Sequence, residues 1–170
     1  SFPDVRLAAI ADMNVELGQD TARRYGFEKT YSDWTEVARD PEIDAVSVVV
    51  GNALHLPIAQ GLLEAGKHVL CEKPLAGTLE DAEAMVELEK EYGQKTDAAG
   101  RPLITSVGYT VRRMPALNAI KQKIDSGDFG PVTNFISTYL CDYSCDEKAP
   151  MSWRYKGCLL YTSDAADDSL

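Results

Sequence analysis

The chain has 170 residues, of which 45% are hydrophobic, so it can bury a substantial core and is not expected to be disordered. Its formal net charge of −10 argues against nucleic-acid binding, because a surface that binds phosphates must be basic. The sequence has no apolar run of about 18 residues and no secretory leader, so we expect no membrane segment and a cytoplasmic location.

Strands and helices are predicted in alternation from the start of the chain. VRLAAIA at residues 5–11 predicts a buried strand, and Asn14 is a suitable N-cap for a helix over 15–25 that Gly26 ends. AVSVVV at residues 45–50 is almost entirely apolar and predicts a strand covered on both faces, as in a parallel sheet. The other elements expected in this half are a strand over 29–31, a helix through Ala38 capped by Ser32 or Asp33, a helix over 57–65 and a strand over 67–71.

The same alternation continues in the second half of the chain. Thr78 is a suitable N-cap for a long helix that ends at Tyr92, and a polar loop then leads to a strand over 103–107. An amphipathic helix is expected over 115–126, and the alternating segment VTNFISTYL predicts a strand over 132–140. Repeated strand–helix alternation predicts a doubly wound α/β domain with a parallel sheet.

Polar or turn-forming residues follow four of the predicted strands. Because the strands are parallel, their carboxyl ends meet at one edge of the sheet, where ligands of such folds bind. We therefore expect one binding crevice built from these clusters. They are Asp12, Gly51–Asn52, Glu72–Lys73–Pro74 and Gly108–Tyr109.

Two polar residues of this edge have two possible functions each. Asp12 can accept both ribose hydroxyls of an adenosine, or it can simply begin the helix that follows. No Arg follows Asp12 closely, which favours NAD over NADP as the cofactor, with NADP still possible. The glycine-rich phosphate loop of such a fold belongs about 20 residues upstream, before the first residue given. His55 can hydrogen-bond a cofactor or cap a helix.

The cysteines and the last residues point to no further site. Cys141 and Cys145 are spaced C-x3-C without a second pair of ligands, so we expect no metal and no disulfide framework. The segment 158–170 begins CLLYTSDAADD and resembles a translated sequencing adapter, so we expect a non-native tail. The chain is then expected to be a gene fragment cut at both ends.

Four stretches of the sequence are informative together: DAVSVVVGNALH, GKHVLCEKPLA, SVGYTVRRMPAL and DSGDFGPV. They resemble the Gfo/Idh/MocA family of oxidoreductases, named after glucose–fructose oxidoreductase, inositol dehydrogenase and rhizopine catabolism. The resemblance runs from Val5 to about Gly157. It implies a Rossmann-type sheet that lacks its first strand over residues 1–130, and the start of an α+β open-sheet second domain over 131–157.

The resemblance implies an NAD(P)-dependent enzyme that moves a hydride between a hydroxyl-bearing carbon of a sugar or polyol and nicotinamide. Lys73 is implied to be catalytic, near nicotinamide and substrate, and its bond to Pro74 is implied to be cis. Glu72 is expected to bind cofactor ribose or to hold Lys73. Asn52, His55 and Pro74 complete the expected cofactor site.

The substrate is expected to contact Tyr109, Arg112, Trp153 and Arg154, which match family positions. The D-x-x-x-H motif that supplies acid–base residues in many members does not follow Trp153–Arg154, so we expect the isolated chain to be inactive. The full-length protein is expected to be a homo-oligomer. Two alternatives remain open: an NAD-dependent glycosidase of the same fold, and a non-catalytic dinucleotide-binding module.

Overall fold

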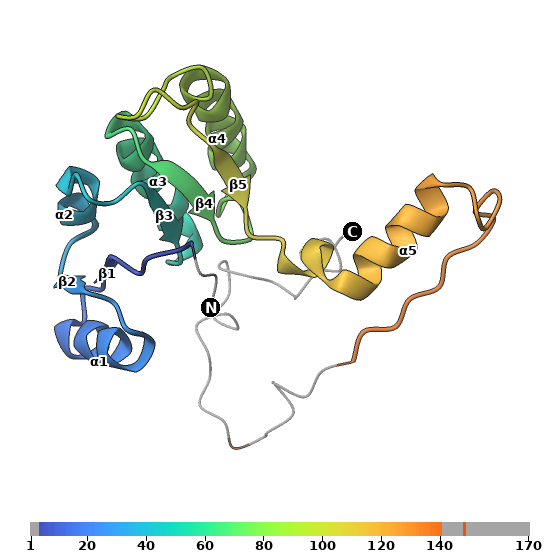
Figure 1. The fold of residues 1–170 in the computed structure, drawn as a ribbon, viewed down its shortest axis with the longest axis horizontal. Coiled ribbons are helices and arrows are strands. Elements are labelled where there is room, and N and C mark those ends of the chain that lie inside the picture. Colours follow the sequence, from blue (N-terminus) through green and yellow to red (C-terminus); the bar gives the residue numbers. More distant parts are fainter. Residues whose placement is uncertain (1–3, 141–147, 149–170) are drawn as a thin grey trace. The chain divides into compact units, whose positions relative to one another are not determined.

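The computed structural model describes residues 4–140 and 148, and the chain divides into two units, residues 1–108 and 109–170 (Figure 1). The predicted domain boundary at residue 130 concerns the whole protein and stays a prediction. The first unit contains β1 (Ala9–Ala11), α1 (Val15–Tyr25), β2 (Lys29–Tyr31), α2 (Trp34–Arg39), β3 (Ala45–Val48), η1 (Asn52–Leu54), α3 (His55–Glu64), β4 (His68–Cys71), α4 (Leu79–Tyr92) and β5 (Thr105–Val107). The second unit contains η2 (Thr110–Arg113) and α5 (Pro115–Asp125).

The helix ends are set by the capping residues that the sequence indicated. The Asn14 side chain accepts the Leu17 N–H at 3.1 Å, which satisfies one of the free amides in the first turn of α1. Gly26 ends α1 in the left-handed conformation at φ 83°, where a residue without Cβ is not strained. Asp33 and Thr78 cap α2 and α4 in the same manner as Asn14.

All described strand pairs are parallel, as predicted. β1 pairs with β2 in one sheet, and the second sheet has the order β3-β4-β5. No ladder joins β1 to β3 within residues 4–140. This arrangement matches a Rossmann order in which one strand position between β1 and β3 is not filled by described residues.

The helices lie on both sides of the β1-β2 pair, with α1 on one side and α2 on the other (Figure 1). The main core lies between the β3-β4-β5 sheet and helices α3 and α4, where Leu62 and Cys71 are almost fully buried. Along β3 and β4, Val48 and Val69 point into this core, whereas Ser47 is exposed. Within the first unit only one face of β3 is therefore covered, and the prediction of two covered faces is wrong there, because no described helix of that unit packs on the other face.

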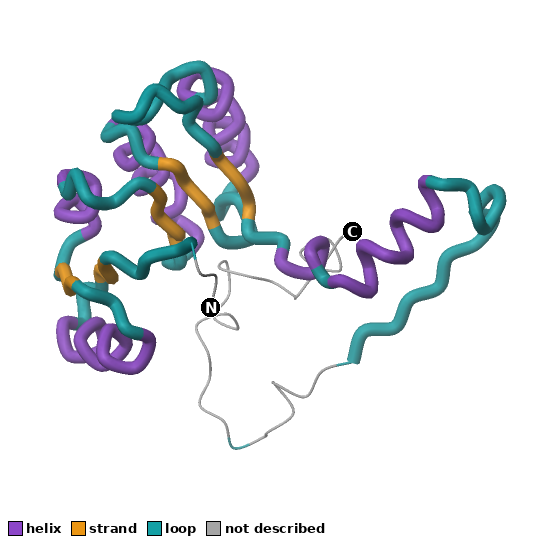
Figure 2. Tube along the Cα trace, in the orientation of Figure 1, coloured by secondary structure: helices purple, strands orange, loops and turns teal. Residues whose placement is uncertain are grey.

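Three other expectations differ from the structure. β1 and β3 are shorter than predicted, and α3 begins at His55 because η1 runs directly into it. The predicted strand over 132–140 is not formed, and Figure 2 draws this segment as loop. A strand requires a neighbour to bond its amides and carbonyls, and no described strand pairs with it. Its Phe135 and Ile136 are both exposed, so the alternation has no buried face to match.

Among the described residues, no helix is both long and apolar enough to cross a bilayer.

Candidate functional site

The candidate site lies at the carboxyl edge of the β3-β4-β5 sheet. The ladder continues past the strands, because the Glu72 N–H donates to the Val48 carbonyl at 3.0 Å and the Gly108 N–H donates to the Cys71 carbonyl at 2.7 Å. The loops after β4 and β5 therefore begin next to each other. Asn52, at the start of η1, belongs to the loop after β3 at the same edge.

The Glu72 carboxylate lies against the backbone of Gly108. A Cβ atom added at Gly108 would lie 2.7 Å from Glu72 Oε1 and 2.9 Å from its Cδ, so only glycine leaves room for this carboxylate. Glu72 Oε2 also accepts the Lys73 backbone N–H at 3.3 Å. Glu72 thus contacts the backbone of Lys73, which was one of its two expected roles, and its contact with cofactor ribose stays a prediction.

Lys73 presents an ammonium group that has no partner among the described residues. The Lys73–Pro74 peptide bond is cis, as the sequence resemblance implied. The Lys73 side chain is exposed, and its Nζ makes no hydrogen bond or ion pair with residues 4–140. An ammonium that is not engaged by a carboxylate remains free to bind a polar group of a ligand.

His55 lies beneath this edge and is 1% exposed. Its Nδ1 is 2.9 Å from the Pro74 carbonyl oxygen, and its Nε2 is 3.2 Å from the Val50 carbonyl oxygen. The His55 side chain does not cap α3, so helix capping, one of the two functions expected for His55, is not found. Its contact with a cofactor stays a prediction. The bridge to Pro74 was missed by sequence reasoning, because the two residues are 19 positions apart and no local pattern relates them.

Asn52, in the loop after β3, lies near Gly77 in the loop after β4. A Cβ atom added at Gly77 would lie 3.5 Å from Asn52 Cβ and from the Ala53 N atom, which is ordinary van der Waals contact. The Asn52 side chain makes no hydrogen bond within the described part of the chain. Its amide is therefore available, and its cofactor role stays a prediction.

Asp12 lies at the carboxyl end of β1 and is half-buried. Its Oδ1 accepts the Asn14 N–H at 2.8 Å, and its backbone N–H donates to the Tyr31 carbonyl. The carboxylate thus supports the turn into α1, which agrees with the expectation that Asp12 begins this helix. No hydrogen bond involves Oδ2 among residues 4–140, so one oxygen remains able to accept from a ligand, and the ribose contact stays a prediction.

The predicted substrate residues belong to the second unit. The Arg112 guanidinium carbon lies 5.2 Å from the centre of the Tyr109 ring, a cation–π distance. Trp153 and Arg154 lie outside the described residues, as do Cys141 and Cys145. No group of three or more His, Cys, Asp or Glu in the described segments is placed to hold a metal ion.

Cys71 and a surface hollow are separate from the candidate chemistry. Burial raises the pKa of the Cys71 thiol to about 11, with Glu72 adding to the shift, so this cysteine stays a neutral core residue.

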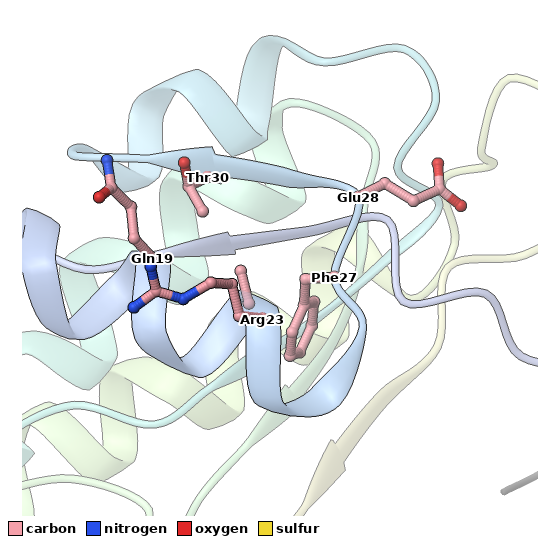
Figure 3. A pocket seen from close by; sticks show the side chains of 6 residues that line it. Gln19, Arg23, Phe27, Glu28 and Thr30 are labelled. Carbon is pink, nitrogen blue, oxygen red and sulfur yellow. The ribbon is translucent and has the colours of Figure 1, made fainter.

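An open hollow of about 330 Å³ lies between α1 and β2 (Figure 3). It contains none of the predicted site residues. Its lining residues are Gln19, Ala22, Arg23, Phe27, Glu28 and Thr30.

Comparisons with known proteins agree with the geometry of the parallel sheet. A family model described as "Oxidoreductase family, NAD-binding Rossmann fold" matches residues 1–98. Levoglucosan dehydrogenase from Pseudarthrobacter phenanthrenivorans is 40% identical over 147 residues, which are 86% of this chain and 35% of the relative. A scyllo-inositol 2-dehydrogenase (NAD(+)) from Bacillus subtilis is 33% identical over 151 residues, 88% of this chain and 40% of the relative.

A solved structure of levoglucosan dehydrogenase in complex with NADH superimposes with a TM-score of 0.79 at 38% identity, over 91% of this chain and 39% of that one. The Rossmann-type α/β fold expected from the sequence is therefore confirmed. The chain spans only about 35% to 40% of the length of the two relatives.

Proposed function

The chain belongs to the Gfo/Idh/MocA oxidoreductase family, whose NAD-binding domain has the Rossmann fold, and from that premise we propose that the whole protein oxidises a hydroxyl group of a sugar or polyol with NAD. The relatives are named for levoglucosan, scyllo-inositol and 1,5-anhydro-D-fructose, which supports this substrate class. The proposed homo-oligomer and the cytoplasmic location stay predictions.

The observation that carries the proposal is the unpaired Lys73 ammonium at the carboxyl edge of a parallel sheet. Ligands of doubly wound sheets bind at this edge. Glu72 and the amide of Asn52 lie at the same edge, so a cation, a carboxylate and an amide are available to a polar ligand there. Asp12 ends β1 with one carboxylate oxygen free to accept, which fits the hydroxyl groups of a ribose.

When bound, NAD supplies the ring carbon that accepts the hydride. The chain's own contribution is to bind the substrate hydroxyl and to assist the transfer of its proton. Lys73 can donate a hydrogen bond to the hydroxyl oxygen and so orient the carbon that loses hydride. As the hydroxyl becomes a carbonyl its proton must leave to a base, and Lys73 can accept it only in its neutral amine form, since the ammonium form only donates. Glu72 steadies the Lys73 backbone through the 3.3 Å hydrogen bond.

The test is Lys73→Met in the whole protein, which keeps an unbranched side chain one atom shorter and removes its charge. The kcat for NAD reduction with sugars and polyols is expected to fall roughly 10²- to 10⁴-fold, the usual range for one acid–base group. The affinity for NADH, measured by fluorescence titration, is expected to change little. Lys90→Met, which removes an exposed lysine of an α4 ion pair, is the matched control and should leave kcat unchanged.

Two results would contradict the proposal. One is an unmodified protein that neither binds NADH nor reduces NAD with any polyol tested. The other is a Lys73→Met variant with unchanged kcat, which would remove Lys73 from the chemistry. Hydrolysis of aryl glycosides without accumulation of NADH would instead assign the glycosidase alternative. Binding of NADH without any turnover would assign the non-catalytic module.

A further inference from the structure

His55 connects two loops of the candidate site through its ring. The ring is 1% exposed and lies between the Pro74 carbonyl oxygen, 2.9 Å from Nδ1, and the Val50 carbonyl oxygen, 3.2 Å from Nε2. Val50 precedes η1 in the loop after β3, and Pro74 lies in the loop after β4. The imidazole therefore links the two loops directly at the carboxyl edge of the sheet.

Both neighbours of the ring are hydrogen-bond acceptors, because a carbonyl oxygen only accepts. No backbone N–H of residues 4–140 donates to either carbonyl, and a neutral His55 ring, which carries one N–H, can donate to only one of them. The shorter contact, from Nδ1 to Pro74, is the stronger candidate for a donated proton. The ring is 1% exposed, so its two nitrogens face these carbonyl groups rather than solvent.

The residue next to Pro74 is Lys73. The pyrrolidine ring fixes the backbone torsion φ of Pro74, so holding the Pro74 carbonyl in place also restricts the peptide unit that carries Lys73. Glu72 holds the other side of Lys73 by accepting its N–H. Lys73 is thus restrained at its backbone from both sides, while its ammonium group stays unpaired.

We propose that His55 is a positioning residue, which ties the Pro74 carbonyl to the loop after β3 and thereby holds Lys73 at the carboxyl edge. This inference rests on the proposed function of Lys73. It gives His55 a role in the placement of the reacting group rather than in direct contact with cofactor. Misplacement of a reacting group by about 1 Å can cost on the order of 100-fold in rate, so the contact is expected to affect kcat.

The experiment compares three substitutions in the whole protein. His55→Asn places an amide N–H near the position of Nδ1, and His55→Gln places one near the position of Nε2, whereas His55→Phe keeps a ring and offers no donor. We expect His55→Phe and His55→Gln to lose kcat roughly 10- to 100-fold, with a smaller change in KM. We expect His55→Asn to recover several-fold of that loss, because it restores the donor to Pro74.

The control is His68→Phe, the same substitution at the first residue of β4, away from the candidate site. His68 bonds Asp97 and the Ile104 N–H, so this variant is expected to lower the thermal unfolding temperature without changing kcat. A readout independent of activity is amide hydrogen exchange over residues 73–77. Exchange there should be faster in His55→Phe than in His55→Asn, while exchange in the middle of α4 stays the same in both.

Several outcomes would overturn the inference. These are an unchanged kcat in His55→Phe, equal kcat in the Asn and Gln variants, or equal exchange of residues 73–77 in all variants. If His55→Phe fails to fold, the comparison of Asn with Gln still decides, since both are polar amides. An unmodified protein without turnover would contradict the proposed function, and the exchange comparison would then test His55 by itself.

Discussion

Gly108 keeps space for the Glu72 carboxylate, because a Cβ atom at this position would lie 2.7 Å from Glu72 Oε1. The atoms that an added Cβ would meet are the far end of a flexible side chain, which can move aside. We therefore expect Gly108→Ala to fold with nearly unchanged thermal stability but to displace the Glu72 carboxylate. The affinity for NADH or the kcat of the whole protein should then fall, measured by fluorescence titration and steady-state kinetics.

Gly77→Ala is the matched control for Gly108→Ala. Its added Cβ would meet Asn52 and Ala53 at 3.5 Å, a normal contact distance, so binding and rate should stay close to those of the unmodified protein. The opposite pattern, in which Gly77→Ala loses function and Gly108→Ala keeps it, would show that the Glu72 carboxylate has no part in the site.

Asp12 offers a second test at the scale of one residue, on cofactor choice. Asp12→Asn keeps an oxygen that can accept the Asn14 N–H and removes the negative charge. A neutral amide is a weaker acceptor for ribose hydroxyls and repels a 2′-phosphate less than a carboxylate does. We expect the KM for NAD to rise roughly tenfold and the preference for NAD over NADP to shrink. Steady-state kinetics with both cofactors measures this, and an unchanged preference would place the ribose elsewhere.

At the scale of elements, a polar network holds the connection from α4 to β5. Asp97 in this loop accepts the Ala99 and Arg101 N–H groups, the Arg101 Nε–H and His68 Nε2–H. The Ile104 N–H donates to His68 Nδ1, so the proton of the neutral ring is on Nε2 and points to Asp97. This network lies at the amino end of β4 and is separated from the candidate site by the length of the strand.

Asp97 makes the stability of this connection depend on pH in the acidic range. The backbone hydrogen bond from Arg101, with further bonds from the Arg101 and His68 side chains, lowers the pKa of Asp97 to about 2. Because the pKa is lower in the folded protein, the stabilisation is present above the ordinary aspartate pKa near 4 and is lost as the pH falls toward 2.

The measurement is the urea midpoint of the whole protein at several pH values between about 5 and 2. Asp97→Asn should be less stable than the unmodified protein at pH 5, and its midpoint should fall less steeply with acid. Part of the slope should remain, because a hydrogen bond from Lys29 also holds the pKa of Asp40 low. Asp20→Asn, at an exposed ion pair of α1, is the control and should keep the full slope. An identical slope in Asp97→Asn would refute the assignment.

At the scale of the whole molecule, the first unit of the 170-residue chain has strand edges without hydrogen-bond partners and an exposed apolar sheet face among its described residues. No ladder joins β1 to β3 in the described region, so both strands keep an open edge there. The face of the sheet opposite α3 and α4 exposes Leu70 within that unit, and Ile136 is exposed in the second unit. Open edges and exposed apolar side chains favour association and weaken cooperative folding.

We therefore expect the isolated 170-residue chain to be poorly soluble and to unfold without a sharp transition. Differential scanning calorimetry and binding of a hydrophobic dye are the measurements, and dye binding before heating is expected. A single sharp endotherm with no dye binding in the cold would contradict this expectation. The whole protein serves as the comparison and should unfold cooperatively under the same conditions.

The sequence by itself determined the local elements, and its resemblance to the family singled out the segment Glu72–Lys73–Pro74, whose role in the chemistry stays a prediction. The bounds of α1 and α4 agree with prediction, because Asn14, Gly26 and Thr78 act on backbone groups within a few residues of themselves. The parallel sheet followed from strand–helix alternation alone. The cis bond between Lys73 and Pro74 was implied by the family resemblance and is confirmed, without any knowledge of distant contacts.

Only the tertiary structure decided which distant groups meet. The bridge from His55 to Pro74 and the fit of Glu72 against Gly108 join segments that become neighbours only when β3, β4 and β5 align. The failure of the predicted strand over 132–140 has the same origin, because an alternating pattern forms a strand only beside a partner. Capping depends on bonds between near neighbours in sequence, whereas side-chain contacts and strand pairing depend on the register of the sheet, which no local pattern specifies.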